Sequence, residues 1–289
     1  PLLQLARKLP NMSRAQRRMP VMGSFASAYF VAGDTGLKQT SSVAWENKYI
    51  DAEELAVIVP IPESVLDDSD FDIWAQIRPE IERALSKAIT AAVLYGTNIP
   101  ASWTTNLGGA GLVAAAPALH KIVNTNYTDL YEAILGEKGD GTDGVFMLVE
   151  ADGFNVTGSI AHLSMRGKLR NVRDTEGMPI FKTNMQDATR YELDGTPLFF
   201  PSDGSMVAAS SLLISGQWDQ LVYAMRQDIT YKVLTESVIQ DQSGNIVYNL
   251  AQQDMIALRA VMRLGFSLPN PPTRENETDA SRFPFAIMT

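Results

Sequence analysis

The densest group of residues that could do chemistry is the acidic run DDSDFD at 67–72. From Asp68 the run reads D-x-D-x-D, which is how a calcium-binding loop begins. An EF-hand loop also needs Gly at its sixth position and Glu at its twelfth, because that Glu completes the oxygen shell around the ion. Counted from Asp68, those positions hold Ile73 and Pro79. We therefore expect the acidic run to begin a helix and to bind no metal.

The rest of the sequence lacks catalytic residue patterns. The two histidines, His120 and His162, lie far apart and outside any H-E-x-x-H zinc motif. No G-x-S-x-G elbow presents a serine nucleophile. The chain has no Cys, which excludes disulfides, zinc-thiolate sites and thiol catalysis. GGAG at 108–111 lacks the Lys-Ser/Thr of a phosphate loop and predicts a turn. We expect no cofactor and no enzymatic activity.

The strongest secondary-structure pattern is a helix that follows the acidic run. Apolar residues recur at three- and four-residue steps from Trp74 to Leu94, and Gly96 ends the pattern. Ser69 is the expected N-cap, with two carboxylates of the acidic run in the first turn, where each stabilises the helix dipole by about 0.3–1 kcal/mol. Pro79 falls inside the pattern and is expected to kink or break the helix.

Residues 29–59 predict a two-stranded ribbon. Tyr29–Val31 form one expected strand, Val43–Tyr49 form the other, and a polar tip separates them. A ribbon of two strands is marginal in water by itself. We therefore expect the ribbon to lie on its own domain or on a neighbouring subunit.

Shorter patterns predict a mixed α+β chain. Residues 97–118 are loop-like, 127–135 form a helix closed by Gly136 as a left-handed cap, and 158–172 form a basic helical or mixed segment. Residues 218–226 look helical, and 255–263 form a helix or a strand. Expected strands lie at 145–149, 178–181, 197–200, 211–215 and 229–239.

The charge is unevenly distributed. The net charge is -9, yet residues 1–33 carry only positive charges, and the remainder holds 19 basic and 33 acidic residues. A basic arm on an acidic body favours docking on protein or nucleic acid. Few charges and no interleaved aromatic residue favour protein, and a plain disordered tail is the alternative. The basic residues of the arm are Arg7, Lys8, Arg14, Arg17 and Arg18.

Membrane and export signals are missing from the sequence. No run of about 18 apolar residues could span a bilayer. The first residues, PLLQLARKLP, lack the apolar core and cleavage site of a secretory signal. Because the chain begins at Pro1, we expect either a trimmed initiator Met or the removal of a longer segment.

The stretch VPIPESVLDDSDFDIWAQIRPEIERALSKAITAAVLYGTN, 59–98, resembles the major capsid proteins of tailed bacteriophages of the Hong Kong 97 type. That family has a short element near "IPE", an Asp/Ser cap, a long spine helix and a Gly-Thr exit. Four later stretches agree with the family in order and spacing. They are LRNVRDTEGMPIF (169–181), DGTPLFFPSDG (194–204), LLISGQWDQLVYAMRQDITYKV (212–233) and MRLGFSLPNP (262–271).

The resemblance implies a Hong Kong 97-type α+β fold with four parts. Residues 1–28 would be an N-terminal arm running beneath a neighbouring subunit, and 29–60 an extended β-hairpin loop lying over an adjacent one. The peripheral domain, with the spine helix, would comprise 61–111 and 225–289. The axial domain, at the capsomer centre, would comprise 112–224.

The implied function is self-assembly into the icosahedral head shell around phage double-stranded DNA. The partners would be further copies in hexamers and pentamers, with scaffold, portal and cement proteins, weak non-specific DNA contact and no membrane. The location would be the virion capsid, assembled in the host bacterial cytoplasm. The candidates for contact between subunits are the five basic residues of the arm with Lys38, Trp45, Glu46, Lys48 and Tyr49.

Some members of this family cross-link a loop Lys to an Asn of a neighbour with the help of a Glu. Lys38 and Lys48 are available in the loop of this chain. Aligning on Arg263 places Asp254 at the Asn position and Val261 at the Glu position. A carboxylate lacks the amide leaving group and Val moves no proton, so we expect a non-covalent shell.

Two alternatives stay open at this point. An encapsulin, a bacterial nanocompartment shell of the same fold, would be distinguished by a cargo-binding site and a cargo enzyme. A soluble α+β hydrolase would be distinguished by turnover of ester, phosphate or glycoside substrates that is lost on mutating a clustered Asp or Glu.

Overall fold

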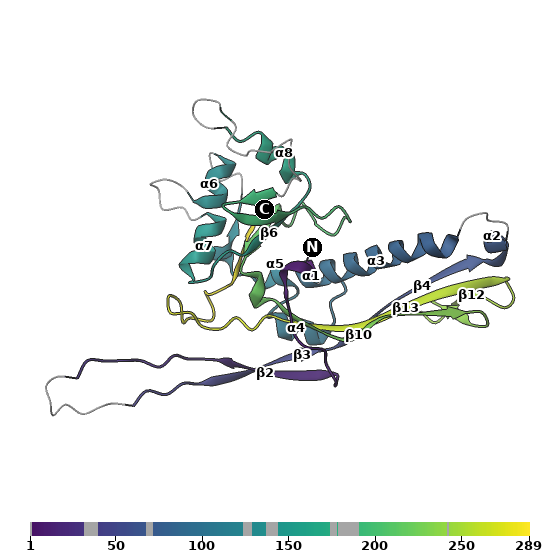
Figure 1. Cartoon of the computed structure of the whole chain (residues 1–289), viewed down its shortest axis with the longest axis horizontal. Helices are drawn as coiled ribbons and strands as arrows, with labels where there is room; N and C mark the ends of the chain where they lie inside the picture. Colours follow the sequence, from purple (N-terminus) through teal and green to yellow (C-terminus); the bar gives the residue numbers. More distant parts are fainter. Residues whose placement is uncertain are drawn as a thin grey trace.

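The computed structural model describes residues 2–31, 40–67, 72–123, 129–136, 144–173, 178, 191–241 and 243–289. These residues form a compact part, with short helices around a six-stranded sheet, and an elongated part, with one long helix on a long sheet (Figure 1). A two-stranded ribbon leaves the molecule on the side opposite the long sheet. The mixture of helices and sheets agrees with the predicted α+β class.

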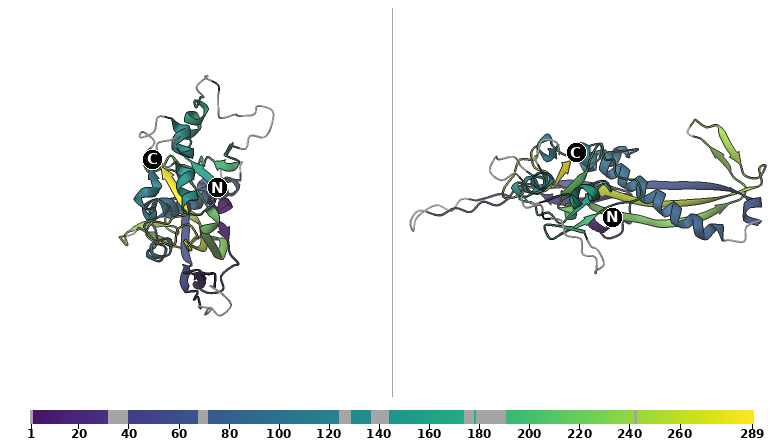
Figure 2. Two further views of the ribbon diagram at one scale, coloured as in Figure 1. Left: turned by 90° about the vertical axis from the view of Figure 1, so that its left-hand side faces the viewer. Right: turned by 90° about the horizontal axis from the view of Figure 1, so that it is seen from above.

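The elongated part is a helix lying on a sheet. Helix α3 (Ile73–Tyr95) runs along a four-stranded sheet with the strand order β1-β10-β13-β4 (Figure 2). Strands β10, β13 and β4 are antiparallel, and β1 is parallel to β10. The strands are β1 (Arg7–Lys8), β10 (Val222–Leu234), β13 (Met255–Ser267) and β4 (Glu53–Pro62).

Side-chain alternation explains why this sheet holds the helix. On β13, Leu258 and Ala260 are buried and share one core with Ile81 and Leu85 of α3. The intervening Arg259 is exposed, because successive side chains of a strand point to opposite faces. The helix therefore covers one face of the sheet only.

The start of α3 differs in detail from the sequence prediction. Its N-cap is Asp72, whose Oδ1 accepts a hydrogen bond from the backbone N–H of Ala75 at 3.2 Å, and Asp72 thus lies outside the first turn. The predicted cap, Ser69, lies outside the described residues. Gly96 ends the helix in the left-handed conformation, as predicted.

Of the kink or break predicted at Pro79, the break is wrong, because α3 continues through Pro79 as one helix of 23 residues. Proline removes one backbone hydrogen bond. Most helix stability in proteins comes from packing of the apolar face, and Ile77, Ile81 and Leu85 on both sides of Pro79 pack in the core.

Residues 97–118 are more regular than the predicted loop. They contain the short helices α4 (Ala101–Leu107) and α5 (Leu112–Ala115), while GGAG forms the predicted turn between them. A Cβ at Gly111 would overlap the backbone nitrogen of Gly96. The glycine lets this turn pack directly on the end of α3.

The compact part surrounds a mixed sheet with the strand order β5-β14-β9-β6-β8-β7. Three helices, α6 (Leu130–Leu135), α7 (Val145–Ala151) and α8 (Met165–Arg170), contribute apolar side chains to the same core. The strands are β5 (Lys121–Ile122), β14 (Phe285–Met288), β9 (Leu213–Gly216), β6 (Gly158–Ala161), β8 (Thr196–Phe199) and β7 (Tyr191–Leu193). The strands expected at 197–200 and 211–215 and the mixed segment at 158–172 are confirmed.

The strand predicted at 145–149 is wrong, because these residues begin helix α7. A short apolar run fits a buried strand and a buried helix equally well. The burial pattern decides: Val145, Phe146, Leu148 and Val149 are buried, whereas Met147 is exposed. Alternation along a strand would have placed Met147 on the same face as Val145 and Val149.

Two further details of the compact part also differ. The helix predicted at 127–135 begins at Leu130, and Gly136 has φ 120° and ψ 150°, which is not the left-handed cap conformation. Of the strand predicted at 178–181, only Met178 is described, and it belongs to no strand.

The segment after residue 217 is a strand where a helix was predicted. Trp218–Gln220 form one 3-10 turn, and β10 then begins at Val222. The run predicted as one strand at 229–239 is divided between β10 and a separate hairpin. Residues 255–263 lie in β13, which settles the alternative left open between helix and strand.

The remaining elements complete the ends of the molecule. A hairpin of β11 (Val238–Gln240) and β12 (Ile246–Asn249) and the short helix α2 (Glu63–Asp67) lie at the far end of the long sheet (Figure 1). Among the described residues, no helix has the length and apolar character needed to cross a membrane.

Both chain ends pack against the body. Near the N-terminus, α1 (Leu2–Leu5) buries Leu2, and the N–H of Met12 donates to the carbonyl of Met225 at 2.8 Å. The disordered-tail alternative is therefore wrong for residues 2–12. At the other end, β14 is fully buried between β5 and β9. This strand thus lies in the compact part, whereas the sequence had grouped it with the peripheral segment 225–289.

Candidate functional site

The described residues do not assemble a metal centre. They contain no group of three or more His, Cys, Asp or Glu side chains that could hold a metal ion. His162 contacts Ser164 of its own turn at 2.8 Å. His120 is buried elsewhere, with its Nε2 2.9 Å from Oδ2 of Asp152. The two histidines thus belong to separate local structures, as their sequence separation predicted.

The His120–Asp152 pair is a buried structural contact. Asp152 Oδ2 also accepts the backbone N–H of Phe283 at 2.7 Å, and Oδ1 accepts the side-chain amide of Asn276 at 2.7 Å. Burial lowers the pKa of His120 below its ordinary value, and the nearby Asp152 carboxylate opposes that shift. The carboxylate thereby holds the segment that leads into β14 against α7.

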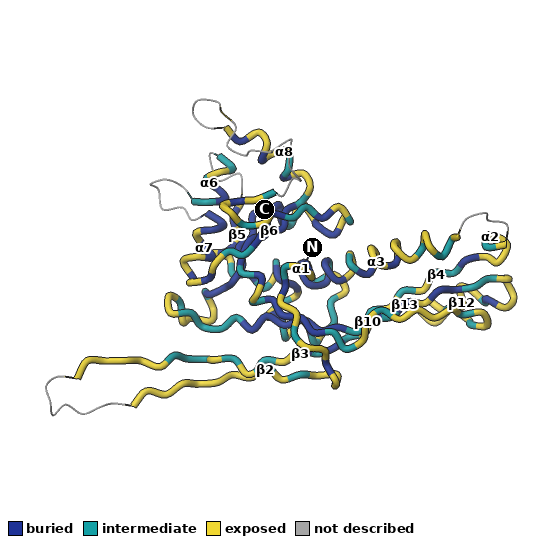
Figure 3. The backbone as a smooth tube through the Cα atoms, viewed as in Figure 1, coloured by how far each residue is buried: buried dark blue, intermediate teal, exposed yellow. Residues whose placement is uncertain are grey.

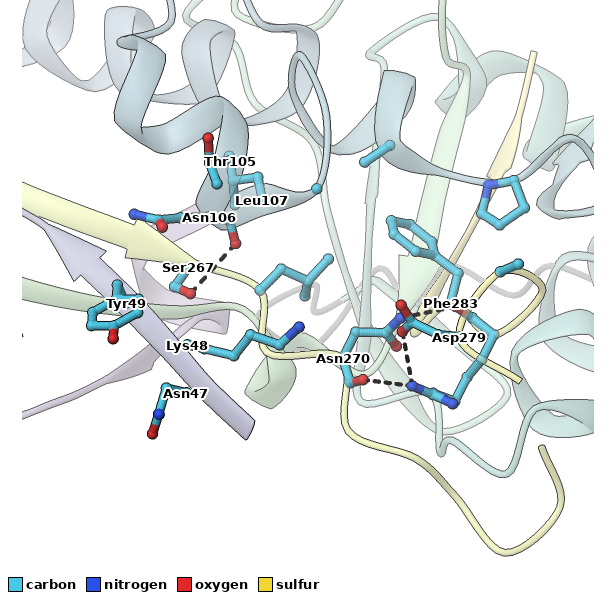
Figure 4. Close-up of a pocket in the computed structure, with 16 residues that line it drawn as sticks. Asn47, Lys48, Tyr49, Thr105, Asn106, Leu107, Ser267, Asn270, Asp279 and Phe283 are labelled. Atoms are coloured by element: carbon cyan, nitrogen blue, oxygen red, sulfur yellow. Dashed lines mark hydrogen bonds and ion pairs between the residues drawn. The ribbon is translucent and has the colours of Figure 1, made fainter. Parts of the chain in front are cut away.

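A polar cavity of about 400 Å³ lies between the ribbon and the body (Figure 4). Asp279 is the only carboxylate among its described lining residues, and it lies 3.1 Å from the Arg282 guanidinium. Arg282 also donates to the carbonyl of Asn270 at 2.9 Å. The cavity therefore offers neither a paired acid and base nor an activated nucleophile.

The exposed ribbon is the most distinctive feature of the molecule (Figure 3). Strand β2 (Gln16–Met22) pairs antiparallel with β3 (Trp45–Asp51), so that Met22 lies opposite Trp45 and Arg18 opposite Tyr49. The predicted first strand, Tyr29–Val31, is wrong, because those residues form no strand. The basic arm supplies the first strand instead.

The signal for this pairing was present in the sequence. In QRRMPVM, Met19 and Val21 alternate with the exposed Arg18, Pro20 and Met22. Such alternation is typical of a half-buried strand. The sequence prediction interpreted these residues by their positive charge and therefore missed the alternation.

The two faces of the ribbon have different surroundings. Ile50 is fully buried and packs near Met19 against the body. On the opposite face Met22, Trp45 and Tyr49 are exposed, and Trp45 keeps 64% of its surface accessible. We call Met22, Trp45 and Tyr49 the outer ribbon face. Tyr49, at 40% exposed, also lines the cavity against the body, whereas the Trp45 ring is mostly uncovered by the described chain, although large apolar groups usually lie inside proteins.

The other predicted contact residues are divided between two places. Arg7 and Lys8 are exposed on β1, and Arg14 is exposed before the ribbon. The remaining ones belong to the ribbon, except Lys38, which lies outside the described residues. In the ribbon, Arg17 donates to the carbonyl of Pro10 at 3.0 Å, Arg18 to Asn47 at 2.6 Å, and Lys48 lies 3.3 Å from Glu46.

The base of the ribbon contains functional candidates that the sequence prediction missed. The Asp51 carbonyl accepts the indole N–H of Trp103 at 3.0 Å, and Asp51 Oδ2 accepts the side-chain amide of Asn106 at 3.0 Å. Gly265 of β13 lies directly against Asp51. A glycine within a strand often marks close approach of another backbone, and Gly265 was the one available signal.

The positions aligned with the cross-linking residues lie near the far end of the sheet and within it. Asp254 precedes β13 with φ 47°, and its carbonyl accepts the N–H of Glu63 at 2.9 Å. Val261 is half-buried in β13 between Ala56 and Thr230.

Comparisons with known proteins identify the family. A model of the phage capsid family matches residues 1–272. The major capsid protein of Staphylococcus phage 80alpha is 25% identical over 270 residues, which cover 92% of this chain and 76% of that protein. A solved structure from Microbacterium phage Oxtober96 has a TM-score of 0.81 and 32% identity, covering all of this chain and 90% of that one.

A structure from Mycobacterium phage Cain is also similar, with a TM-score of 0.76 and 26% identity over the whole of this chain and 89% of that one. These matches extend across both parts of the molecule and the ribbon, as the ordered sequence motifs had indicated. The chain therefore belongs to the phage capsid family and has its Hong Kong 97-type fold.

Proposed function

We propose that this chain is a major capsid protein whose copies assemble into the icosahedral head shell around phage double-stranded DNA. The observation that carries the proposal is the outer ribbon face, where Trp45 keeps 64% of its surface accessible in the described chain. A two-stranded ribbon needs a packing partner in water. In a capsid family, whose members act as repeated copies, a second subunit is the partner with the matching chemistry.

We assign the parts of a capsid subunit to residue ranges according to the observed fold. Residues 1–28 act as the arm and 29–60 as the extended loop, with β2 and β3 joining the two in one ribbon. Residues 61–111 and 225–289, apart from β14, form the peripheral domain around α3, and 112–224 form the axial domain at the capsomer centre. Because β14 pairs with β9 and β5, we assign it to the axial domain.

The proposed contacts between subunits use the ribbon and the arm. The exposed residues of the ribbon supply apolar area, and the arm supplies positive charge to an acidic neighbour. Fully buried aromatic side chains dominate the binding energy of most protein interfaces, so Trp45 and Tyr49 carry more of the contact than the charges. The full set is Arg7, Lys8, Arg14, Arg17, Arg18, Lys38, Trp45, Glu46, Lys48 and Tyr49.

The proposed partners beyond the shell follow from the charge. A chain of net charge -9 repels the phosphate backbone as a whole, so contact with the packaged DNA is weak and non-specific. Scaffold, portal and cement proteins complete the assembly, which takes place in the cytoplasm of the bacterial host. We propose that the shell is non-covalent, because Asp254 and Val261 cannot support the amide cross-link.

The alternatives have less support. The family model and the curated relative are both phage capsid proteins, which favours a phage head over an encapsulin shell. For the hydrolase alternative, the His162–Ser164 contact at 2.8 Å pairs a base with a hydroxyl, but it lies within one exposed turn and does not line the described cavity. We propose that the chain has no enzymatic activity.

The deciding experiment is light scattering with negative-stain electron microscopy on the purified chain. Closed particles of megadalton mass without co-purifying cargo support the phage shell. Particles that retain an enzyme favour an encapsulin. A chain that stays at 31.6 kDa, both alone and with the other head proteins of its phage, contradicts the proposal.

A further inference from the structure

Strand β3 of the ribbon joins the body through a short connection. Strand β3 ends at Asp51, and β4 begins at Glu53, which pairs at once with Leu264 of β13. Only Ala52 separates the two strands, and it is buried. The direction of the ribbon is therefore decided within residues 50–53.

Helix α4 binds this connection with three side chains. Ser102 donates to a carboxylate oxygen of Glu53 at 2.6 Å, Trp103 donates to the Asp51 carbonyl, and Asn106 donates to the Asp51 carboxylate. The donors occupy consecutive turns of one helix, and the acceptors lie on either side of Ala52. A rotation of the ribbon about Ala52 would have to break the two hydrogen bonds to Asp51, whereas the bond to Glu53 fixes the start of β4 in the body.

The central donor is fixed in the core of the protein. Trp103 is 4% exposed, and its ring packs edge-on against Phe266 with 5.2 Å between the ring centroids. Aromatic pairs of this geometry add about 0.5–1.5 kcal/mol beyond the burial of their area. The indole N–H thus offers the Asp51 carbonyl a rigid partner.

Gly265 of β13 packs directly against the connection between β3 and β4. A Cβ at this position would overlap the Asp51 carbonyl oxygen and lie 2.8 Å from Cγ2 of Ile50. Ile50 is fully buried, so it cannot move aside. The backbone of β3 can pass this close to β13 only because residue 265 has no side chain.

The second strand of the ribbon is tied down at the same end. The N–H of Ala52 donates to the carbonyl of Ala15 at 2.7 Å, just before β2 begins. Arg17 donates to the carbonyl of Pro10 at 3.0 Å, which joins the ribbon to the arm. Both strands thus leave the body from a fixed base.

We propose that α4 and Gly265 form a clamp that sets the angle at which the ribbon leaves the body, and that Trp103, Asn106 and Gly265 are positioning residues for shell assembly. About ten extended residues of the ribbon, counted away from the body from Asp51, span roughly 33 Å. A rotation of the ribbon by about 10° at its base therefore moves its far end by about 6 Å. Such a shift would misplace the outer ribbon face on a neighbour. The assembly part of this inference rests on the proposed function, whereas the angle itself is a property of the single subunit.

The angle can be measured directly because the chain has no Cys. Two introduced cysteines, Val43→Cys on the ribbon and Arg83→Cys on the exposed side of α3, would carry spin labels on the full chain at dilution. Pulsed electron paramagnetic resonance then reports the distance between the labels. The parent chain is expected to give one narrow distance distribution.

Three variants loosen the clamp in different ways. Trp103→Phe keeps the aromatic packing and removes only the indole donor, Asn106→Ala removes the amide donor, and Gly265→Ala adds the overlapping Cβ. Each is expected to broaden the distribution or to shift its maximum by about 5 Å, given the length of the ribbon. Gly167→Ala is the matched control, because a Cβ there meets nothing within 4 Å, and it is expected to leave the distribution unchanged.

The outcomes separate the clamp from the proposed function. If Gly265→Ala fails to fold, the two donor variants, checked by thermal melting, still test the clamp. An unchanged distribution in folded Trp103→Phe and Asn106→Ala would overturn it. A changed distribution with parental yields of closed particles would overturn the role in assembly. If the parent chain forms no particles, either alone or with the other head proteins of its phage, the proposed function fails, while the distance result stands by itself.

Discussion

His120 and Asp152 lie on different elements and meet inside the compact part, with 2.9 Å between Nε2 and Oδ2. His120 is the last residue of a 3-10 turn, and Asp152 follows α7. Nδ1 of His120 has no hydrogen-bond partner among the described residues. The pair packs beside Phe283, whose ring centroid lies 6.2 Å from that of the imidazole. A histidine in this position is more easily accommodated neutral than charged.

Stability of the folded subunit should fall as the pH drops below about 6.5, the ordinary pKa of histidine. The folded pKa of His120 is lowered mainly by burial, so the unfolded chain binds the proton first. The contribution of His120 to the free energy of unfolding is complete above the pKa of this histidine in the unfolded chain. It is lost as the pH falls toward its lower pKa in the folded protein. Denaturant unfolding between pH 5 and 8 measures this slope.

Replacing His120 tests whether this histidine causes the pH dependence of the free energy of unfolding. His120→Gln is expected to flatten the pH dependence below about pH 6.5, since one titrating group is removed. His162→Gln removes the other histidine, which bonds Ser164 at the surface, and serves as the control. Equal flattening by both variants would contradict the assignment to the buried pair.

Trp45→Ala should weaken assembly far more than it destabilises the subunit. Trp45 is 64% exposed in the single chain, so its removal should change the free energy of unfolding by about 0.5 kcal/mol or less. Truncating an aromatic residue that acts as an interface hot spot costs about 2 kcal/mol or more of binding free energy. Particle yield and thermal melting of the same preparation compare the two effects.

Ile50→Ala provides the opposite case. Ile50 is fully buried in its own subunit, so its truncation should cost about 2–5 kcal/mol of folding stability. Parallel losses of melting temperature and assembly in Trp45→Ala would instead place Trp45 in the core of its own subunit.

Mature particles should dissociate into single chains under denaturing conditions. Asp254 offers no amide leaving group, and the half-buried Val261 has no proton to transfer. Denaturing electrophoresis is therefore expected to give one band at 31.6 kDa. A ladder of high-mass species would rule out the non-covalent shell.

Loss of the α3 cap should measurably destabilise the subunit. Asp72→Ala removes the acceptor for the Ala75 N–H and should cost about 1 kcal/mol. Asp72→Ser keeps a capping oxygen and should retain most of the stability. Urea unfolding of both variants makes the comparison, and equal losses would mean that the hydrogen bond contributes nothing.

The sequence by itself determined the features that depend on local periodicity. In helix α3, apolar residues recur along one face over 23 residues, and a pattern of this length fits a helix and not a strand. Gly96 ends the helix. The family resemblance rested on the order of motifs along the chain, which needs no tertiary information. The lack of a catalytic residue pattern was likewise a property of the sequence.

Only the tertiary structure decided which segments meet. The partner of β3 is the basic strand β2, β14 lies in the compact sheet, and the apolar run 145–149 is helical. Short runs carry too few repeats to separate helix from strand, and strand pairing depends on contacts between distant residues. The contact of Asp51 with Trp103, 52 positions away, exists only because the folded sheet brings β3 across β13 beneath α4.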